Sequence, residues 1–165
     1  MIREATINDA ARTAEIDAVS SRFAYRYILS EELLNGLTAE SRVPVHTRWI
    51  REKLFDMYVY EDPSTGIVKA MMGMGMNEDE DKENAFELHF IYVDPEYVRQ
   101  GIGSEMIRFF EAKGKEKGCR EFVIWVLEEN EIGRNCYEKN HYHFDGKDKI
   151  FKRWGKREIR YVKTV

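Results

Sequence analysis

A glycine-spaced turn between an apolar strand and an apolar-periodic helix is the segment of this sequence best suited to chemistry. It reads V-D-P-E-Y-V-R-Q-G-I-G-S, from Val93 to Ser104. Gly101 and Gly103 leave their main-chain N–H groups uncovered, and the helix that follows adds unpaired donors and the positive end of its dipole. Arg99 supplies a cation beside them. The segment therefore predicts an anion site of the kind that binds phosphate.

The spacing of this turn excludes two common phosphate motifs. A P-loop requires Gly-Lys-Ser/Thr at its end, and that triplet is absent. A dinucleotide-binding fingerprint requires a third glycine three positions after Gly103, where Met106 stands. The link from the strand is also long and contains Pro95, unlike the tight turn of that fingerprint. A nicotinamide or flavin cofactor is therefore not expected.

The turn resembles motif A of the GCN5-related N-acetyltransferases, the GNAT superfamily. That motif reads [Q/R]-x-x-G-x-[G/A] after a strand ending in a V-x-P-type sequence. Its six positions are occupied here by Val98, Arg99, Gln100, Gly101, Ile102 and Gly103. Val98 replaces the usual Gln or Arg, so we expect Arg99 to supply the missing side-chain contact. The resemblance implies that these residues and Ser104 bind the pyrophosphate of acetyl-CoA, which serves as co-substrate without a metal.

A second segment strengthens the resemblance. Residues 130–142 read N-E-I-G-R-N-C-Y-E-K-N-H-Y, similar to the family's N-x-x-[AG]-x-x-[FL]-Y-[EK]-[KR]-x-G-[FY], with Cys136 and His141 as departures. By resemblance, Asn130 hydrogen-bonds the pantetheine arm or the acyl region. The resemblance likewise implies that Tyr137 lies near the cofactor sulfur and protonates it as it leaves. The structural alternative for Tyr137 is a half-buried tyrosine that packs a helix against the sheet.

Acyl transfer to an amine also requires a group that removes a proton. An alkyl amine with a pKa of about 10.4 is mostly protonated at neutral pH, so a carboxylate or imidazole must accept that proton. Glu87 and His89 lie two apart on the strand before the turn, hence on one face. Glu87 is the first candidate and His89 the second; each has an equally good structural interpretation. On the same strand, the resemblance assigns the main chain around Ile91, Tyr92 and Val93 to the pantetheine and the thioester carbonyl.

The amine acceptor stays open at this level. The stretch S-R-F-A-Y-R-Y-I-L-S resembles a segment common in family members that act on small molecules, so Tyr25, Arg26 and Tyr27 are candidate substrate-binding residues. Aromatic rings suit an amine's apolar body or its charge, but they equally pack two helices together. The acidic turn at 78–81 would attract a polyamine, or is a solvated loop. Polyamine, aminoglycoside, amino acid and protein amines remain alternatives.

Length and composition exclude other classes. A chain of 165 residues with 43% hydrophobic residues fits one GNAT-type domain over 1–165. A net charge of −4 argues against a nucleic-acid binder. No apolar run spans a bilayer and the first residues lack a signal-peptide core, so we expect no membrane partner and a cytoplasmic location. Cys119 and Cys136 are interpreted as reduced thiols, and no metal cluster forms around His141 and His143. A homodimer is left open.

Hydrophobic periodicity predicts a mixed α/β fold, with an α+β mixed sheet, in the order β-α-α-α-β-β-β-α-β-α-β-β, which resembles the GNAT fold. The first helix follows a cap at Asn8 or Asp9, and its apolar positions include Ala14, Ile16, Val19 and Phe23. Strands are expected at 2–5, 57–61, 67–76, 86–93, 122–127, 142–151 and 157–163, and further helices at 30–37, 41–54, 102–117 and 130–140. The 86–93 and 122–127 strands should be parallel, because a helix connects them.

Two functions follow. The favoured one is an N-acetyltransferase that transfers the acetyl group of acetyl-CoA to a primary amine of a small molecule or peptide. The alternative is a non-catalytic acyl-CoA-binding or sensing domain of the same fold. An acidic protein-interaction module would require the glycine turn to be accidental.

Overall fold

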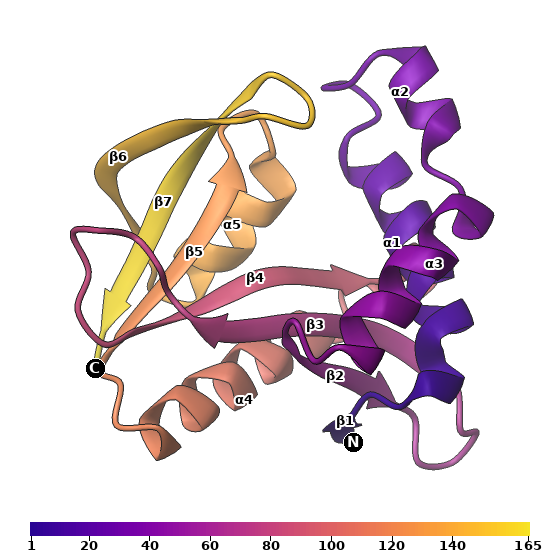
Figure 1. The fold of residues 1–165 in the computed structure, drawn as a ribbon, viewed down its shortest axis with the longest axis horizontal. Helices are drawn as coiled ribbons and strands as arrows, with labels where there is room; N and C mark the ends of the chain where they lie inside the picture. Colours follow the sequence, from indigo (N-terminus) through magenta and orange to yellow (C-terminus); the bar gives the residue numbers. More distant parts are fainter. The chain divides into compact units, whose positions relative to one another are not determined.

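The computed structural model describes residues 1–165 and contains one seven-stranded mixed sheet in the order β1-β2-β3-β4-β5-β7-β6 (Figure 1). The strands are β1 Ile2–Glu4, β2 Asp56–Glu61, β3 Val68–Met76, β4 Ala85–Val93, β5 Glu121–Leu127, β6 His143–Phe151 and β7 Lys156–Thr164. The α-helices are α1 Ala10–Ala24, α2 Glu31–Gly36, α3 Ala39–Arg51, α4 Ile102–Glu116 and α5 Glu131–Lys139. Two short 3₁₀ helices, η1 Ile7–Asp9 and η2 Pro95–Tyr97, complete the chain. The order and type of the predicted elements are confirmed.

The chain forms two compact units. The first comprises Met1–Gly73 and Phe90–Met106, and the second comprises Met74–His89 and Ile107–Val165. β3, β4 and α4 each continue from one unit into the other. The glycine turn belongs to the first unit, whereas both candidate proton acceptors and the 130–142 segment belong to the second.

In the first unit, α1 and α3 pack side by side (Figure 1). A fully buried cluster around Ile16 and Val59 forms the core, with Trp49 and Phe90 packed against it. The rings of these two aromatic residues stack with centroids 4.8 Å apart. Gly73 makes room for this stack, because a Cβ there would lie 2.2 Å from Cζ of Phe90. The core therefore depends on a glycine in the middle of β3.

A buried polar network joins α1 to α3. Asp17 accepts a hydrogen bond from Nε of Arg42 at 2.6 Å, and Nε2 of His46 lies 2.9 Å from the same oxygen. His46 is fully buried, and its Nδ1 lies 3.0 Å from the hydroxyl of Thr13. Buried charges require partners of this kind. Phe23, one of the predicted apolar positions of α1, is 41% exposed, and the guanidinium of Arg26 lies over its ring.

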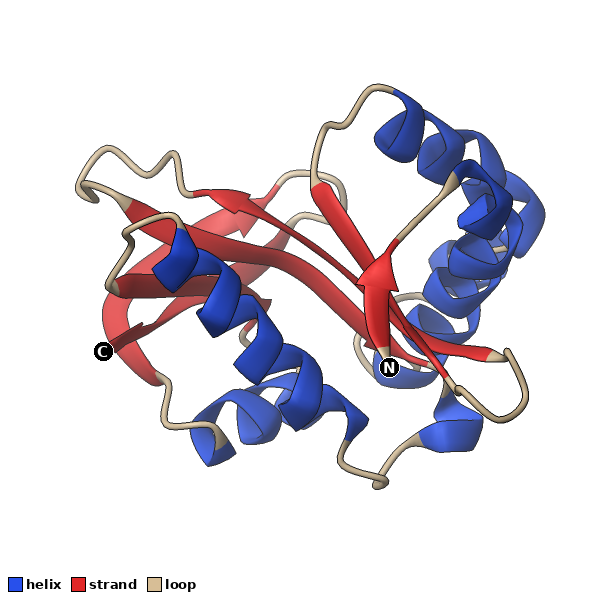
Figure 2. Cartoon of the chain, turned by 90° about the horizontal axis from the view of Figure 1, so that it is seen from below, coloured by secondary structure: helices blue, strands red, loops and turns tan.

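In the second unit, β4 and β5 pair in parallel, with Ala85 opposite Glu121 and Leu88 opposite Ile124. The β5–β7 and β6–β7 pairs are antiparallel. α4 lies against one face of these strands (Figure 2), where Phe110 stacks on Phe86. β5 is buried on both faces, as its unbroken apolar run predicts: Phe122 and Ile124 on one face and Val123 on the other are at most 1% exposed. Val123 packs with Ala85 and Val162. The candidate proton acceptors lie on the same face of β4 as Ala85.

Candidate active site

The start of the glycine turn is fixed by an ion pair. Nη2 of Arg12, on α1, lies 2.6 Å from Oδ2 of Asp94, and Nε of Arg12 donates to the Val68 carbonyl at 3.0 Å. The other carboxylate oxygen of Asp94 accepts the Glu96 N–H and so begins η2. Asp94 is only 6% exposed. These contacts anchor the chain at the last residue before the turn.

The turn itself adopts the backbone that its glycines permit. Gly101 has a φ of +81° and open space where a side chain would be, and Arg99 also has a positive φ of +63°. The first turn of α4 closes when the Glu105 N–H donates to the Gly101 carbonyl at 3.0 Å. The earlier N–H groups of the helix have no intrahelical acceptor. Val98, Arg99 and Gln100 are exposed, as an anion site at this turn requires.

The end of β4 is tied to the helices of the first unit. The Val93 carbonyl accepts the Ser20 hydroxyl at 2.9 Å. The pKa of Tyr92 is well above its ordinary value because the phenol is removed from water, and because Tyr25 and Asp17 lie close to it. Tyr92 packs against the core cluster of this unit, and Tyr25 lies near Tyr92.

Two of the three predicted acceptor residues form an exposed cluster after α1. Arg26 donates to the Phe23 carbonyl, and its guanidinium lies over the rings of Phe23 and Tyr27, at 4.3 and 4.8 Å from their centroids. Tyr27 is 88% exposed. The structure therefore brings Arg26 and Tyr27 together at the surface, while Tyr25 lies near Tyr92.

The two candidate proton acceptors are neighbours on β4. Nδ1 of His89 lies 3.3 Å from Oε1 of Glu87, and Oε2 of Glu87 accepts a hydrogen bond from the Asn77 side chain at 2.8 Å. Gly75 faces the other ring nitrogen, since a Cβ at this position would lie 3.3 Å from Nε2 of His89. A carboxylate that holds one ring nitrogen orients the imidazole for proton transfer at the other. Sequence reasoning missed Asn77, although its position at the end of β3 was a usable signal.

The second matching segment places Asn130 at the start of α5. Its Oδ1 accepts the Gly133 N–H at 3.0 Å, so the side chain caps the helix. Gly133 is required there, because a Cβ would lie 2.8 Å from Nδ2 of Asn130. Tyr137 is 8% exposed, with its ring 6.4 Å from that of Tyr161. Capping and packing are therefore established roles of these two residues.

Two carboxylates of the acidic turn after β3 are paired within the second unit. Arg160 is 3% exposed and binds Asp79, Asp81 and Asp145 at 2.6 to 3.1 Å. The hydrogen bond from Arg160 lowers the pKa of Asp81. Asp79 also accepts the indole N–H of Trp125 at 3.0 Å. Arg160 was not predicted as important, and no local pattern in the sequence marks it.

Residues 25–142 match the sequence model of the acetyltransferase (GNAT) family. The chain belongs to this family. The predicted enzyme class, an acyltransferase of the N-acetyltransferase type, is thereby confirmed, as is the mixed α/β fold.

Individual relatives and solved structures are similar to this acetyltransferase over most of its length. A spermidine N(1)-acetyltransferase of Thermoplasma acidophilum is 27% identical over 154 residues, which cover 89% of this chain and 90% of the relative. The crystal structure of PaiA N-acetyltransferase from T. acidophilum in complex with coenzyme A superposes with a TM-score of 0.77 at 22% identity, covering 100% and 98% of the two chains. YncA of Salmonella typhimurium, a protein solved with acetyl-CoA, gives a TM-score of 0.68 at 15% identity, with 99% and 92% covered.

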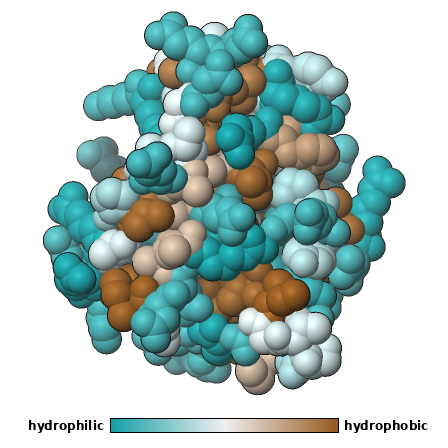
Figure 3. Space-filling view, turned by 90° about the vertical axis from the view of Figure 1, so that its right-hand side faces the viewer, coloured by the Kyte–Doolittle hydropathy of each residue, from teal (hydrophilic) through white to brown (hydrophobic).

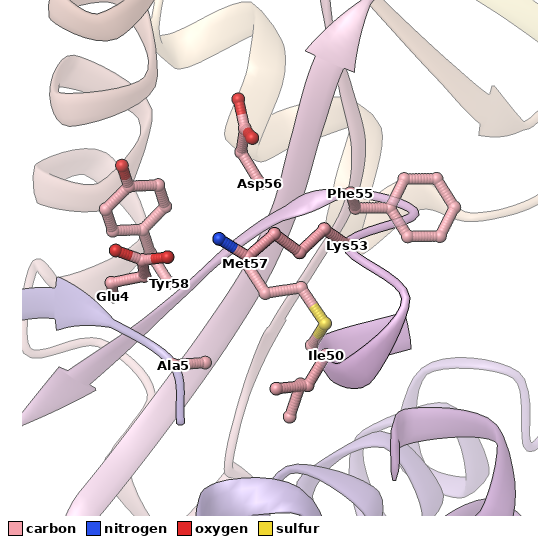
Figure 4. A pocket seen from close by; sticks show the side chains of 8 residues that line it. All are labelled: Glu4, Ala5, Ile50, Lys53, Phe55, Asp56, Met57 and Tyr58. Carbon is pink, nitrogen blue, oxygen red and sulfur yellow. The ribbon is translucent and has the colours of Figure 1, made fainter. Parts of the chain in front are cut away.

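A cavity lies in the first unit of the acetyltransferase. It measures about 250 Å³ and lies where β1 and the end of α3 meet β2 (Figure 4). Its walls are formed by Glu4, Ala5, Ile50, Lys53, Phe55, Asp56, Met57 and Tyr58. None of the predicted site residues lines this cavity.

No group of three or more His, Cys, Asp or Glu residues in the acetyltransferase is arranged to hold a metal ion. None of its helices has the length and apolar character needed to cross a membrane. On the face shown in Figure 3, hydrophobic residues form separate patches between hydrophilic ones.

Proposed function

We propose that this acetyltransferase transfers the acetyl group of acetyl-CoA to a primary amine of a small molecule or peptide. The observation that carries the proposal is the glycine turn, anchored by Asp94 and opened by the positive φ of Gly101, in a chain of the GNAT family. The structure of a relative with bound coenzyme A supports the choice of co-substrate. The family match includes segments of both units, which supports a single GNAT-type domain over 1–165.

In this proposal the main chain of Gly101 to Ser104 binds the pyrophosphate of acetyl-CoA. Helix N-termini and exposed backbone N–H groups are well suited to phosphate oxygens. Val98 and Gln100 contribute through the backbone of the turn, and Arg99 adds a mobile cation at its edge. The site therefore depends on backbone shape more than on side-chain charge.

The acyl end of the cofactor is assigned to the neighbouring segments. Main-chain groups of Ile91, Tyr92 and Val93, which lie beyond the β4 residues that pair with β5, would hold the pantetheine and polarise the thioester carbonyl. Oδ1 of Asn130 is used as a helix cap, so its amide N–H group is the part that would donate to the pantetheine.

For the proton transfer we propose that His89 accepts the proton and that Glu87 orients it. Both oxygens of Glu87 are occupied, one by Asn77 and one near Nδ1 of His89, which favours the imidazole over the carboxylate as the acceptor. The amine loses its proton to Nε2 of His89, directly or through water, and its nitrogen attacks the thioester carbon. The carbon–sulfur bond then breaks, and Tyr137 donates the proton that the departing thiolate takes up.

We propose a polyamine as the acceptor. The basis is the relative named as a spermidine N(1)-acetyltransferase. Arg26 and Tyr27, together with the nearby Tyr25, would then lie on the acceptor side. An amino acid, an aminoglycoside and a peptide amine serve as the comparison acceptors.

The proposal is tested in two steps with the full chain. Acetyl-CoA at 100 times its dissociation constant adds about 2.7 kcal/mol of stability, which for a chain of this size raises the melting temperature by roughly 5 to 11 °C. Release of free CoA thiol is then measured across the amine panel. Stabilisation together with thiol release supports the enzyme. Stabilisation without release from any amine supports the acyl-CoA-binding alternative, and no stabilisation contradicts both.

A further inference from the structure

Lys149 contacts Trp125 and Glu158 in the second unit, and none of these three residues takes part in the proposed proton transfer. The ammonium of Lys149 lies 4.0 Å from the centroid of the Trp125 ring and 3.7 Å from Oε1 of Glu158. An aromatic face and a carboxylate are the two partners that bind an alkylammonium in proteins. The arrangement therefore already holds an alkylammonium, supplied by the protein's own lysine.

Strand register places this contact on the same face as Glu87. Glu87 is opposite Val123, which lies two positions before Trp125 on β5. Trp125 is opposite Arg160 on β7, and Glu158, two positions from Arg160, is opposite Lys149 on β6. Residues two apart on a strand point to the same side. The helices α4 and α5 pack on the other side, so no helix of this unit covers the contact.

Lys149 is held weakly. Its side chain is 48% exposed, whereas that of Glu158 is 13% exposed. The separation of 3.7 Å is longer than a hydrogen bond, and exposed ion pairs contribute little to stability. A second alkylammonium therefore replaces Lys149 at little cost, while Trp125 and Glu158 remain in place.

The charges around Glu158 favour a cationic ligand. Arg160 does not neutralise this carboxylate, because it is bound by Asp79, Asp81 and Asp145. Burial raises the pKa of Glu158, Lys149 opposes that rise, and the negative charges of Glu87 and Asp79 add to it. A face with excess negative charge attracts an acceptor that has more than one positive group.

We propose that Trp125 and Glu158 are specificity residues that bind the second ammonium group of a linear di- or polyamine acceptor, in the place that Lys149 now occupies. This inference rests on the proposed function, in which the first amine reacts beside His89. β7 is two strands from β4, a separation of roughly 10 Å at about 4.8 Å per strand. The site thus selects acceptors by the distance between two amines.

The test compares 1,8-diaminooctane with octylamine, which differ only in the terminal amine, as acceptors for the full chain with acetyl-CoA. Glu158→Gln and Trp125→Leu should raise the KM of the diamine about tenfold, with kcat and the KM of octylamine nearly unchanged. Lys149→Ala should lower the KM of the diamine severalfold, because the internal competitor is gone. Lys156→Ala is the matched control, since it removes a lysine of the same hairpin that pairs with Glu129.

Equal changes for the two amines in Glu158→Gln and Trp125→Leu would overturn the inference. So would a diamine KM that does not fall in Lys149→Ala. Calorimetric titration of 1,8-diaminooctane, without acetyl-CoA, separates this result from failure of the proposed function. Suppose that the protein binds the diamine, that Glu158→Gln weakens this binding, and that no thiol is released with any amine of the panel: the ammonium site would then stand and the proposed function would be contradicted. Acetylation of both amines with equal kcat/KM would support the function and overturn the inference. Absence of both diamine binding and diamine turnover would overturn the inference, whatever the other amines show.

Discussion

Arg12 on α1 and Asp94 at the end of β4 are joined at 2.6 Å, although 82 positions separate them in the sequence. The pair fixes the residue from which the glycine turn departs. A helix of the amino-terminal region therefore positions the segment that we assign to the cofactor pyrophosphate.

Replacing Arg12 should weaken cofactor binding, although the Arg12 side chain is not assigned a contact with the cofactor. Loss of a charged hydrogen bond to a buried carboxylate costs about 1.5 to 3 kcal/mol, so Arg12→Ala should raise the Kd for acetyl-CoA about tenfold or more. Calorimetry measures the Kd. Glu15→Gln is the matched control, because it removes the other, exposed ion pair of Arg12 and leaves Asp94 bound. If both variants lost affinity equally, the effect would not come from Asp94.

Arg99 is the only cation within the six-residue motif. We expect Arg99→Ala to raise the Kd for acetyl-CoA severalfold, since an exposed charge–phosphate contact contributes about 1 kcal/mol. The contact should weaken as salt increases, because exposed charges are screened. Titrations at low and high ionic strength check this. An Arg99→Ala protein with wild-type affinity at low salt would show that the backbone of the turn suffices.

Tyr137 should matter to the chemical step more than to binding. Tyr137→Phe keeps the ring that packs near Tyr161 and removes only the hydroxyl. As general acid, the hydroxyl contributes about 10²- to 10⁴-fold, so kcat should fall by that order while the Kd for acetyl-CoA stays constant. Pre-steady-state thiol release provides the measurement. Undiminished kcat would remove the acid role and leave Tyr137 as a packing residue.

Site residues could be predicted from the sequence where they form a motif of adjacent residues. Residues whose partners lie far away in the sequence could not be predicted. Gly101 with its neighbours, and the segment that begins at Asn130, are recognisable because their patterns involve adjacent residues. Arg12 and Arg160 could not be identified, since Asp94 lies 82 positions from Arg12 and Asp79 lies 81 positions from Arg160. Helical periodicity marks Phe23 as apolar but does not reveal that it lies at the surface, where Arg26 covers its ring. The network at His46 could not be predicted either, because it joins residues of two different helices.

Asp17 should make the stability of the fold depend on pH. Burial alone would raise the pKa of Asp17, but the contact with His46 and the charge of Arg42 lower it below the usual 3.8. A lowered pKa in the folded state gives stability that is complete above the unfolded value and is lost as pH falls through the folded one. Melting temperature should therefore drop below about pH 4.

The Asp17→Asn variant tests the source of this dependence. Breaking a buried charge pair costs about 3 to 5 kcal/mol, so this variant should melt well below the wild type at pH 7 and show a smaller further loss in acid. Glu52→Gln, which removes an exposed pair with Arg48, is the control and should melt with the wild type. Identical acid profiles for wild type and Asp17→Asn would assign the transition to other carboxylates.

The most direct test of acetyl transfer is the release of CoA thiol from acetyl-CoA by the full chain, with spermidine as acceptor, for wild type and His89→Gln. The account predicts amine-dependent release that matches acetylated product one to one, and a kcat lowered about 10²- to 10⁴-fold in His89→Gln at unchanged affinity for acetyl-CoA. Equal amine-dependent turnover by both proteins would contradict the role of His89. Absence of thiol release with every amine tested, from wild type that binds acetyl-CoA, would contradict acetyl transfer itself.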